Sequence, residues 1–120
     1  VRKFSLGYPD DFTYTEYKET EEAHTIVFED KNKEKSFQIF YTPYYGDTIT
    51  KERLLMDIPS GNYTDLVEVV LGDGTHALVF WSDDTLREVW FLKDGYLYEV
   101  TTHKDLDTWL AEIMKSWEFL

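Results

Sequence analysis

Short runs rich in apolar, aromatic and β-branched residues recur along this chain, some of them alternating with polar residues, and turn residues separate the runs. Such a pattern is typical of β-strands in a partly buried sheet. The last four strands have tight connections, which predicts an antiparallel meander. The predicted strands cover residues 4–8, 24–29, 36–41, 66–71, 77–81, 88–92 and 96–100, and a more polar stretch at 13–22 fits an edge.

The strongest local signal is the pair Asp94-Gly95 between two apolar runs. Both residue types tolerate positive φ, so the pair predicts a two-residue type I′ hairpin. That turn fixes the cross-strand partners: Phe91 with Tyr98, Val89 with Val100, Leu92 with Leu97 and Trp90 with Glu99. Both faces of the hairpin are then largely apolar, and we expect the sheet to need cover on both sides.

Two helices are predicted as that cover. Residues 48–58 fit a short helix capped by Thr48 or Thr50. A longer C-terminal helix is expected to start at Thr102 as N-cap, with Asp105 in a capping-box-like position. Its apolar stripe comprises Leu106, Trp109, Leu110, Ile113, Met114 and Trp117. The predicted fold class is α+β, with a central antiparallel sheet between a short middle helix and a long C-terminal helix (α/β/α).

Composition adds bounds to this picture. A chain of 120 residues is expected to form a single domain, here 1–120, and its 4 Trp, 9 Tyr and 8 Phe exclude a disordered chain. Because the chain has no cysteine, disulfides and thiolate metal sites are excluded. No apolar run approaches the roughly 18 residues of a membrane span.

The charge is strongly acidic, with 12 Lys and Arg against 24 Asp and Glu and a net charge of -12. No Lys or Arg occurs between Arg53 and Arg87, so this segment would repel a phosphate backbone, and nucleic-acid binding is not expected. A solvated surface is the plain interpretation of these acids, and capture of a basic partner is the alternative. The candidate partner surface comprises Asp57, Asp65, Glu68, Asp73, Asp83 and Asp84.

Residues that could carry chemistry do not assemble into a motif. The three histidines, His24, His76 and His103, are scattered, and none has a second ligand at metal-binding spacing. The segment from Asp30 starts like a calcium loop, but Lys35 stands where that loop needs glycine. The neighbouring acids are expected to be solvated rather than to act as a glycosidase pair. We therefore predict no catalytic, cofactor-binding or metal-binding residues, and no enzymatic activity.

Three segments resemble the PsbP-like domains, which include small bacterial lipoproteins. They are the opening Phe4-Ser5-Leu6-Gly7-Tyr8-Pro9 with Phe12, the Ile49-Thr50 to Arg53 helix, and the closing Ile113-Met114-Lys115-Ser116-Trp117-Glu118-Phe119. The resemblance spans nearly the whole chain and rests on core and turn positions. It implies an α/β/α sandwich that lies outside the cytoplasm, is tethered by an upstream segment and acts by binding. It transfers no functional residue and no partner.

The leading expectation is a non-catalytic, monomeric, extracytoplasmic domain of a cell-envelope or secreted protein that binds another protein or serves as a structural module. The first residue, Val1 in place of Met, favours a processed upstream signal or anchor, which would be the chain's only link to a membrane, and a trimmed tag is the alternative. The alternative is a soluble acidic inhibitor or immunity-type protein, cytoplasmic in location, that blocks a basic partner.

Overall fold

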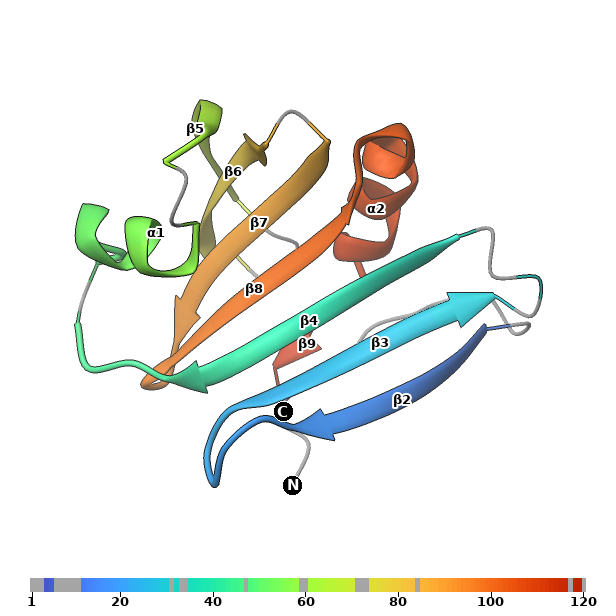
Figure 1. Cartoon of the computed structure of the whole chain (residues 1–120), viewed down its shortest axis with the longest axis horizontal. Helices are drawn as coiled ribbons and strands as arrows, with labels where there is room; N and C mark the ends of the chain where they lie inside the picture. The colour runs from blue at the N-terminus through green and yellow to red at the C-terminus, as the bar shows by residue number, and fades with distance from the viewer. Residues whose placement is uncertain are drawn as a thin grey trace.

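The computed structural model describes residues 4–5, 12–30, 32, 35–46, 48–58, 61–70, 74–83, 85–116 and 118–119. Most of them form one twisted antiparallel sheet in the order β2-β3-β4-β8-β7-β6-β5 (Figure 1). The strands are β2 Phe12–Lys18, β3 His24–Asp30, β4 Ser36–Pro43, β5 Tyr63–Val70, β6 His76–Ser82, β7 Leu86–Lys93 and β8 Tyr96–His103. Two short strands, β1 Phe4–Ser5 and β9 Glu118–Phe119, pair with each other.

The predicted meander is confirmed, because β5, β6, β7 and β8 pair in sequence order and all antiparallel. Asp94 and Gly95 form the β7–β8 turn with φ of 51° and 82°, as a type I′ turn requires. The register is the predicted one, with Phe91 opposite Tyr98 and Trp90 opposite Glu99. The local turn chemistry therefore sets which side chains reach each face.

β8 is the centre of the sheet because it pairs with β7 on one side and with β4 on the other. This second pairing joins residues more than fifty positions apart, such as Ile39 and Val100. It joins the N-terminal strands β2, β3 and β4 to the C-terminal meander in one sheet. Most of β8 is buried as a result, including Tyr98 and Val100.

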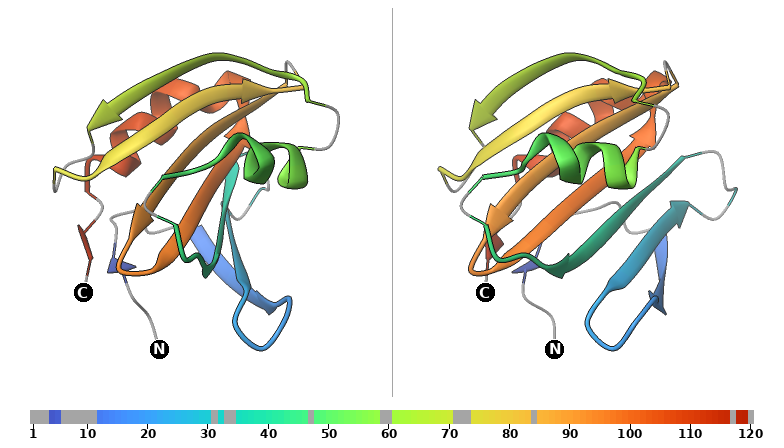
Figure 2. Two further views of the ribbon diagram at one scale, coloured as in Figure 1. Left: turned by 90° about the vertical axis from the view of Figure 1, so that its left-hand side faces the viewer. Right: turned by 60° about the vertical axis from the view of Figure 1, so that its left-hand side comes forward.

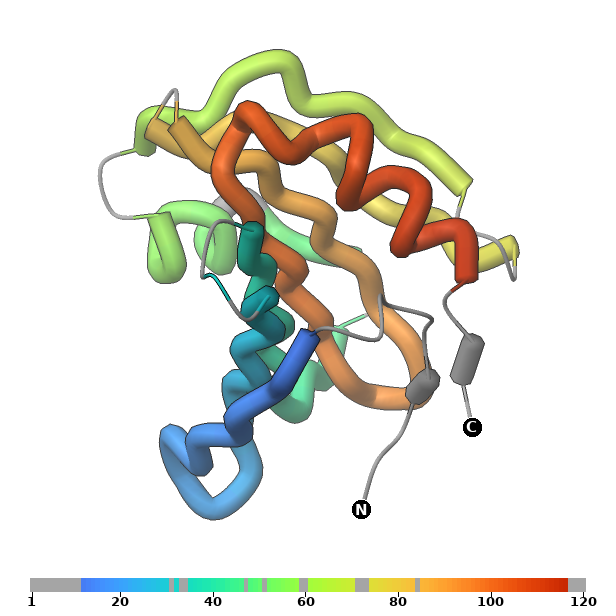
Figure 3. Tube along the Cα trace, turned by 90° about the vertical axis from the view of Figure 1, so that its right-hand side faces the viewer, coloured from blue at the N-terminus to red at the C-terminus, as the bar shows by residue number. Residues whose placement is uncertain are grey.

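The two helices touch opposite faces of the sheet (Figures 2 and 3). Helix α1, Lys51–Asp57, starts after Thr50, whose hydroxyl accepts a hydrogen bond from the Arg53 backbone and confirms one of the two predicted caps. Helix α2, Asp107–Met114, lies on the other face. The α1 face buries Leu54, Ile58, Phe80, Trp90 and Leu97, whereas the α2 face buries a larger group that includes Phe28, Phe37, Val89, Phe91, Val100 and Leu110.

The predicted α/β/α sandwich with a long C-terminal helix is wrong. α1 has 7 residues and α2 has 8, whereas seven strands make up the main sheet, and β2 and β3 extend beyond both helices (Figure 1). The described residues form mainly an antiparallel sheet with two short α-helices. The predicted Trp117 end of the C-terminal helix lies outside the described residues.

Thr102 explains why the helix starts later than predicted. It continues β8 between Phe37 and Arg87, and its hydroxyl donates to the Ser36 carbonyl oxygen at 2.6 Å instead of capping a helix. A 3-10 turn, Lys104–Leu106, comes next, and the Nδ1 atom of His103 accepts its capping hydrogen bond from the Asp105 backbone at 3.3 Å. Pairing on both sides outweighs the capping signal at Thr102.

Candidate functional site

β5 forms one edge of the sheet, and among the described residues no strand pairs with its outer side. Thr64 pairs with Trp81 and Val67 with Val79, so two residues of β5 stand opposite one residue of β6. This is a β-bulge, and Asp65 within it has a φ of 54°. An edge strand offers a row of backbone donors and acceptors to which another extended chain can pair.

The side chains of this edge are unusually apolar for an exposed strand. Leu66, Val67 and Val70 are 41%, 54% and 61% exposed. Edge strands of soluble proteins are commonly guarded by lysine, proline, inward-pointing charge or a β-bulge, and β5 carries the bulge at Asp65. Here Asp65 and Glu68 are the charged residues of the strand. The β5 edge, defined as Tyr63–Val70, therefore combines free strand surface, exposed apolar area and negative charge.

The two faces of the β5 edge differ. Val67 and Val69 stand opposite Val79 and Ala77, whose side chains belong to the core on the α2 side. Glu68 stands opposite Leu78, which packs against the core on the α1 side. Val70 stands opposite His76. Because side chains alternate along a strand, the edge presents Val67 and Val69 toward α2, and Glu68 and Val70 toward α1.

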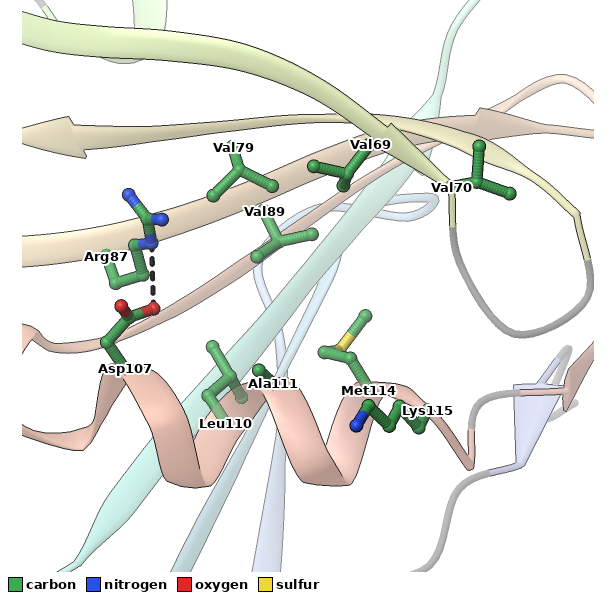
Figure 4. A pocket seen from close by; sticks show the side chains of 10 residues that line it. All are labelled: Val69, Val70, Val79, Arg87, Val89, Asp107, Leu110, Ala111, Met114 and Lys115. Carbon is green, nitrogen blue, oxygen red and sulfur yellow. Dashed lines mark hydrogen bonds and ion pairs between the residues drawn. The ribbon is translucent and has the colours of Figure 1, made fainter.

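A pocket of about 290 Å³ lies between α2 and the β5 to β7 strands (Figure 4). Its wall is mainly apolar and includes Val69, Val79, Val89, Leu110, Ala111 and Met114. At one end the Nε atom of Arg87 donates to Oδ1 of Asp107 at 2.9 Å. Because this ion pair already satisfies the two charges facing each other, the pocket favours apolar groups.

A second hollow, of about 310 Å³, lies on the α1 side of the same strands. Leu78, Trp90 and Leu92 contribute apolar lining. Glu68 and His76 also line it, and their Oε1 and Nδ1 atoms are 3.1 Å apart. Both side chains are about two-thirds exposed, so water screens this pair strongly.

The structure places the six predicted acids in different surroundings. Asp65 and Glu68 lie on the β5 edge. Asp83 lies near its start, because the Asp83 amide donates to the Asn62 carbonyl oxygen at 2.8 Å. Asp57 ends α1 and is engaged by Arg53, whose Nε atom donates to Oδ2 at 3.0 Å. Asp73 and Asp84 lie outside the described residues.

Two buried carboxyls were missed by the sequence reasoning, and Glu88 is the first. Three donors surround it: the Ser82 hydroxyl at 2.8 Å, the Trp90 indole N–H at 3.0 Å and the Thr101 hydroxyl at 2.8 Å. Burial raises the pKa of Glu88, although these three hydrogen bonds oppose the rise. The donors come from β6, β7 and β8, so Glu88 links three strands.

Glu99 is the second buried carboxyl. Its pKa is raised to about 10, mainly by burial and then by the hydrogen bond and negative charge of Asp57, whereas the nearby Arg53 guanidinium lowers it. Among the described residues, no donor lies within hydrogen-bonding reach of Oε2 of Glu99. A protonated Glu99 resolves this because its hydroxyl can donate to Asp57, which Arg53 already holds. This chain of three residues ties the end of α1 to β8.

The sequence contained a signal that Glu99 has an unusual environment. The turn register places it opposite Trp90 on a face that is otherwise largely apolar. An acid at such a position is either at the sheet's rim or buried and neutral. Deciding between these requires knowing that β4 covers the other side of β8, with Phe40 opposite Glu99.

Each histidine lies close to one acid: His24 to Glu16 at 3.1 Å, His76 to Glu68 at 3.1 Å and His103 to Asp105 at 3.5 Å. The sequence spacing did not show these pairs, which bring together separate strands in the first two cases. Within the described ranges, no three histidine or acidic side chains gather into a group that could hold a metal ion. None of the helices that the structure describes has the length and apolarity needed to span a membrane.

No protein-family model and no curated protein matches the chain.

Proposed function

We propose that this protein is a non-catalytic protein-binding module that pairs an extended, basic segment of a partner with the β5 edge. The observation that carries the proposal is an eight-residue edge strand on which six residues are exposed, including Leu66, Val67 and Val70. Strand addition uses the backbone hydrogen bonds of such an edge for affinity and its side chains for specificity.

Charge defines the kind of partner. The net charge is -12, and Asp65 and Glu68 lie on the edge itself, so a lysine- or arginine-rich segment is attracted and an acidic one repelled. A second copy of this chain would bring the same acids together along the edge. Like charges placed across a strand pair are unfavourable. The protein is therefore proposed to be a monomer in the absence of its partner.

A selection from a random-peptide display library on the immobilised protein tests this function. Peptides rich in lysine and arginine should be enriched, and their affinity should fall as salt is raised. The double variant Glu68→Lys with Val70→Lys should lose binding by at least about tenfold, because it reverses the charge of the edge.

The matched control is Glu19→Lys with Tyr17→Lys, which makes the same charge change at the C-terminal end of β2, the strand at the opposite edge of the sheet. It should keep the affinity, and both double variants should keep the circular dichroism spectrum of the parent. Equal losses in the two variants would mean that only net charge matters, and the β5 proposal would be rejected.

The extracytoplasmic location and the PsbP-like relationship stay predictions from the sequence resemblance. Fractionation of cells that express the full gene tests the location: the protein should appear in the envelope or secreted fraction. A purely cytosolic pool would favour the alternative, a soluble inhibitor or immunity-type protein. Both possibilities use the same binding edge for a basic partner.

A further inference from the structure

We infer that the segment bound at the β5 edge alternates apolar and basic side chains, with the apolar ones facing α2 and the basic ones facing α1. This inference rests on the proposed function and names the sequence class of its partner. It follows from the different chemistry of the two faces of one strand.

An added strand repeats the alternation of the strand that it joins. Its side chains point in turn to the two faces of the sheet, next to those of β5 on the same face. On the α2 face these neighbours are Val67 and Val69, and on the α1 face they are Glu68 and Val70. A segment with the matching period therefore meets valines on the α2 face, and the carboxylate of Glu68 beside Val70 on the α1 face.

The α2 face has room for an apolar side chain. The pocket of about 290 Å³ opens beside Val69 and Val70 at the end of β5, and Leu110 and Met114 form its helical side (Figure 4). Sites for drug-sized ligands span about 300 to 1,000 Å³, so this pocket suits one or two aliphatic side chains better than a cofactor. Arg87 and Asp107 neutralise each other at one end.

The α1 face has a carboxylate that can change partner. Glu68 is paired with His76 only through an exposed contact of 3.1 Å. Such exposed pairs contribute little, so an arriving lysine or arginine can take the place of His76 at small cost. The same does not hold for Asp57, which Arg53 and Glu99 already engage.

Three synthetic peptides of equal length test the inference. In the alternating peptide, lysine and valine alternate; in the block peptide, the same lysines precede the same valines; in the acidic peptide, glutamate replaces each lysine of the first. Affinity is measured by fluorescence anisotropy, and the site is mapped by amide chemical-shift changes. The alternating peptide should bind at least about tenfold more tightly than the other two and shift the amides of β5.

Two variants test which face of the sheet receives the apolar side chains of the peptide and which receives the basic ones. Ala111→Phe fills the pocket from an exposed helix position, and it should weaken the alternating peptide about tenfold, whereas Thr108→Phe on the same helix should not. Glu68→Gln should reduce the salt dependence of binding. The control Glu19→Gln, at the other end of the sheet, should leave the salt dependence unchanged.

Failure of the inference and failure of the proposed function give different results. If the block peptide binds β5 as tightly as the alternating one, the edge binds basic chains without reading their pattern, and only the inference is overturned. If no lysine-bearing peptide shifts the amides of β5, the proposed function is overturned as well.

Discussion

At the scale of single residues, the most unusual feature is a pair of acids inside a sheet without buried basic partners of their own. Glu88 is held by three neutral donors from three strands. Glu99 is held by a shared proton with Asp57. Buried carboxyls that are hydrogen-bonded specify one arrangement of the strands around them, because any other arrangement leaves them unpaired.

Glu99 makes stability depend on pH. Its pKa is about 10 in the folded protein, above the value of about 4.3 in an unfolded chain, so folding favours the protonated form. This contribution is complete below about pH 4 and is lost as the pH rises toward 10, at up to about 1.4 kcal/mol for each pH unit. Glu99→Gln keeps the shape of the side chain and offers an N–H donor to Asp57, but glutamine does not ionise. Urea unfolding at several pH values should show that the variant is more stable than the parent at pH 8. Its free energy of unfolding should also depend less on pH.

The control for this experiment is Glu112→Gln, an exposed acid on α2. It should leave the slope of stability against pH between about pH 5 and 9 unchanged. If the parent itself shows no loss of stability across that range, Glu99 is ionised in the folded protein and the shared proton does not exist.

The donors to Glu88 have a measurable energetic role. Thr101→Val removes a hydroxyl at 2.8 Å from Oε1 while keeping the branched shape that suits a strand. Leaving a buried carboxyl short of a donor should lower the free energy of unfolding by about 1 to 3 kcal/mol. Thr15→Val, the same change on the exposed strand β2, should alter it by less than about 0.5 kcal/mol in chemical denaturation. Equal effects at the two sites would show that Glu88 does not depend on this bond.

At the scale of elements, local chemistry explains what the sequence could predict. The β7–β8 hairpin follows from Asp94-Gly95, because the turn type sets the register and the register sets both faces. The start of α2 did not follow from its neighbours in the chain. Thr102 has a capping signal, yet it pairs with β4 and β7, and the β4 pairing is a long-range contact that periodicity cannot reveal.

The turn gives a prediction at this scale. Gly95 has a φ of 82° and open space around the position of an added Cβ, so Gly95→Ala introduces backbone strain without a clash. We expect a loss of about 1 kcal/mol in the free energy of unfolding. Asp94→Gly should be tolerated, because glycine adopts the positive φ of that position freely. Thermal unfolding of the two variants compares these effects, and equal melting temperatures would contradict the assigned turn.

The candidate site was predictable only in part. The gap between Arg53 and Arg87 drew attention to six acids, of which Asp65 and Glu68 lie on the edge strand. Asp57 turned inward to Arg53 and Glu99, because helix α1 packs on the sheet. The sequence shows the sign of each charge, but it does not show whether the side chain points to solvent or into the protein. That orientation is set by the tertiary packing.

At the scale of the whole molecule, the middle of the sheet differs from its β5 margin. β7 and β8 are buried on both faces over most of their length, whereas β5 leaves exposed valines and acids along one margin. The pocket beside α2 and the hollow beside α1 lie on opposite faces of the β5–β7 region. Stability therefore comes from the middle of the sheet and binding is assigned to its margin. Changes at β5 should affect partner affinity more than folding.

The central claim is that an extended basic chain joins the sheet at β5. Amide hydrogen exchange of the protein with and without the alternating lysine–valine peptide measures this directly, since a new strand protects the backbone amides that it binds. The account predicts slower exchange along Tyr63–Val70 and unchanged exchange along Phe12–Lys18 at the opposite edge. Protection of Phe12–Lys18, or saturation with the peptide without any protection of Tyr63–Val70, would contradict it.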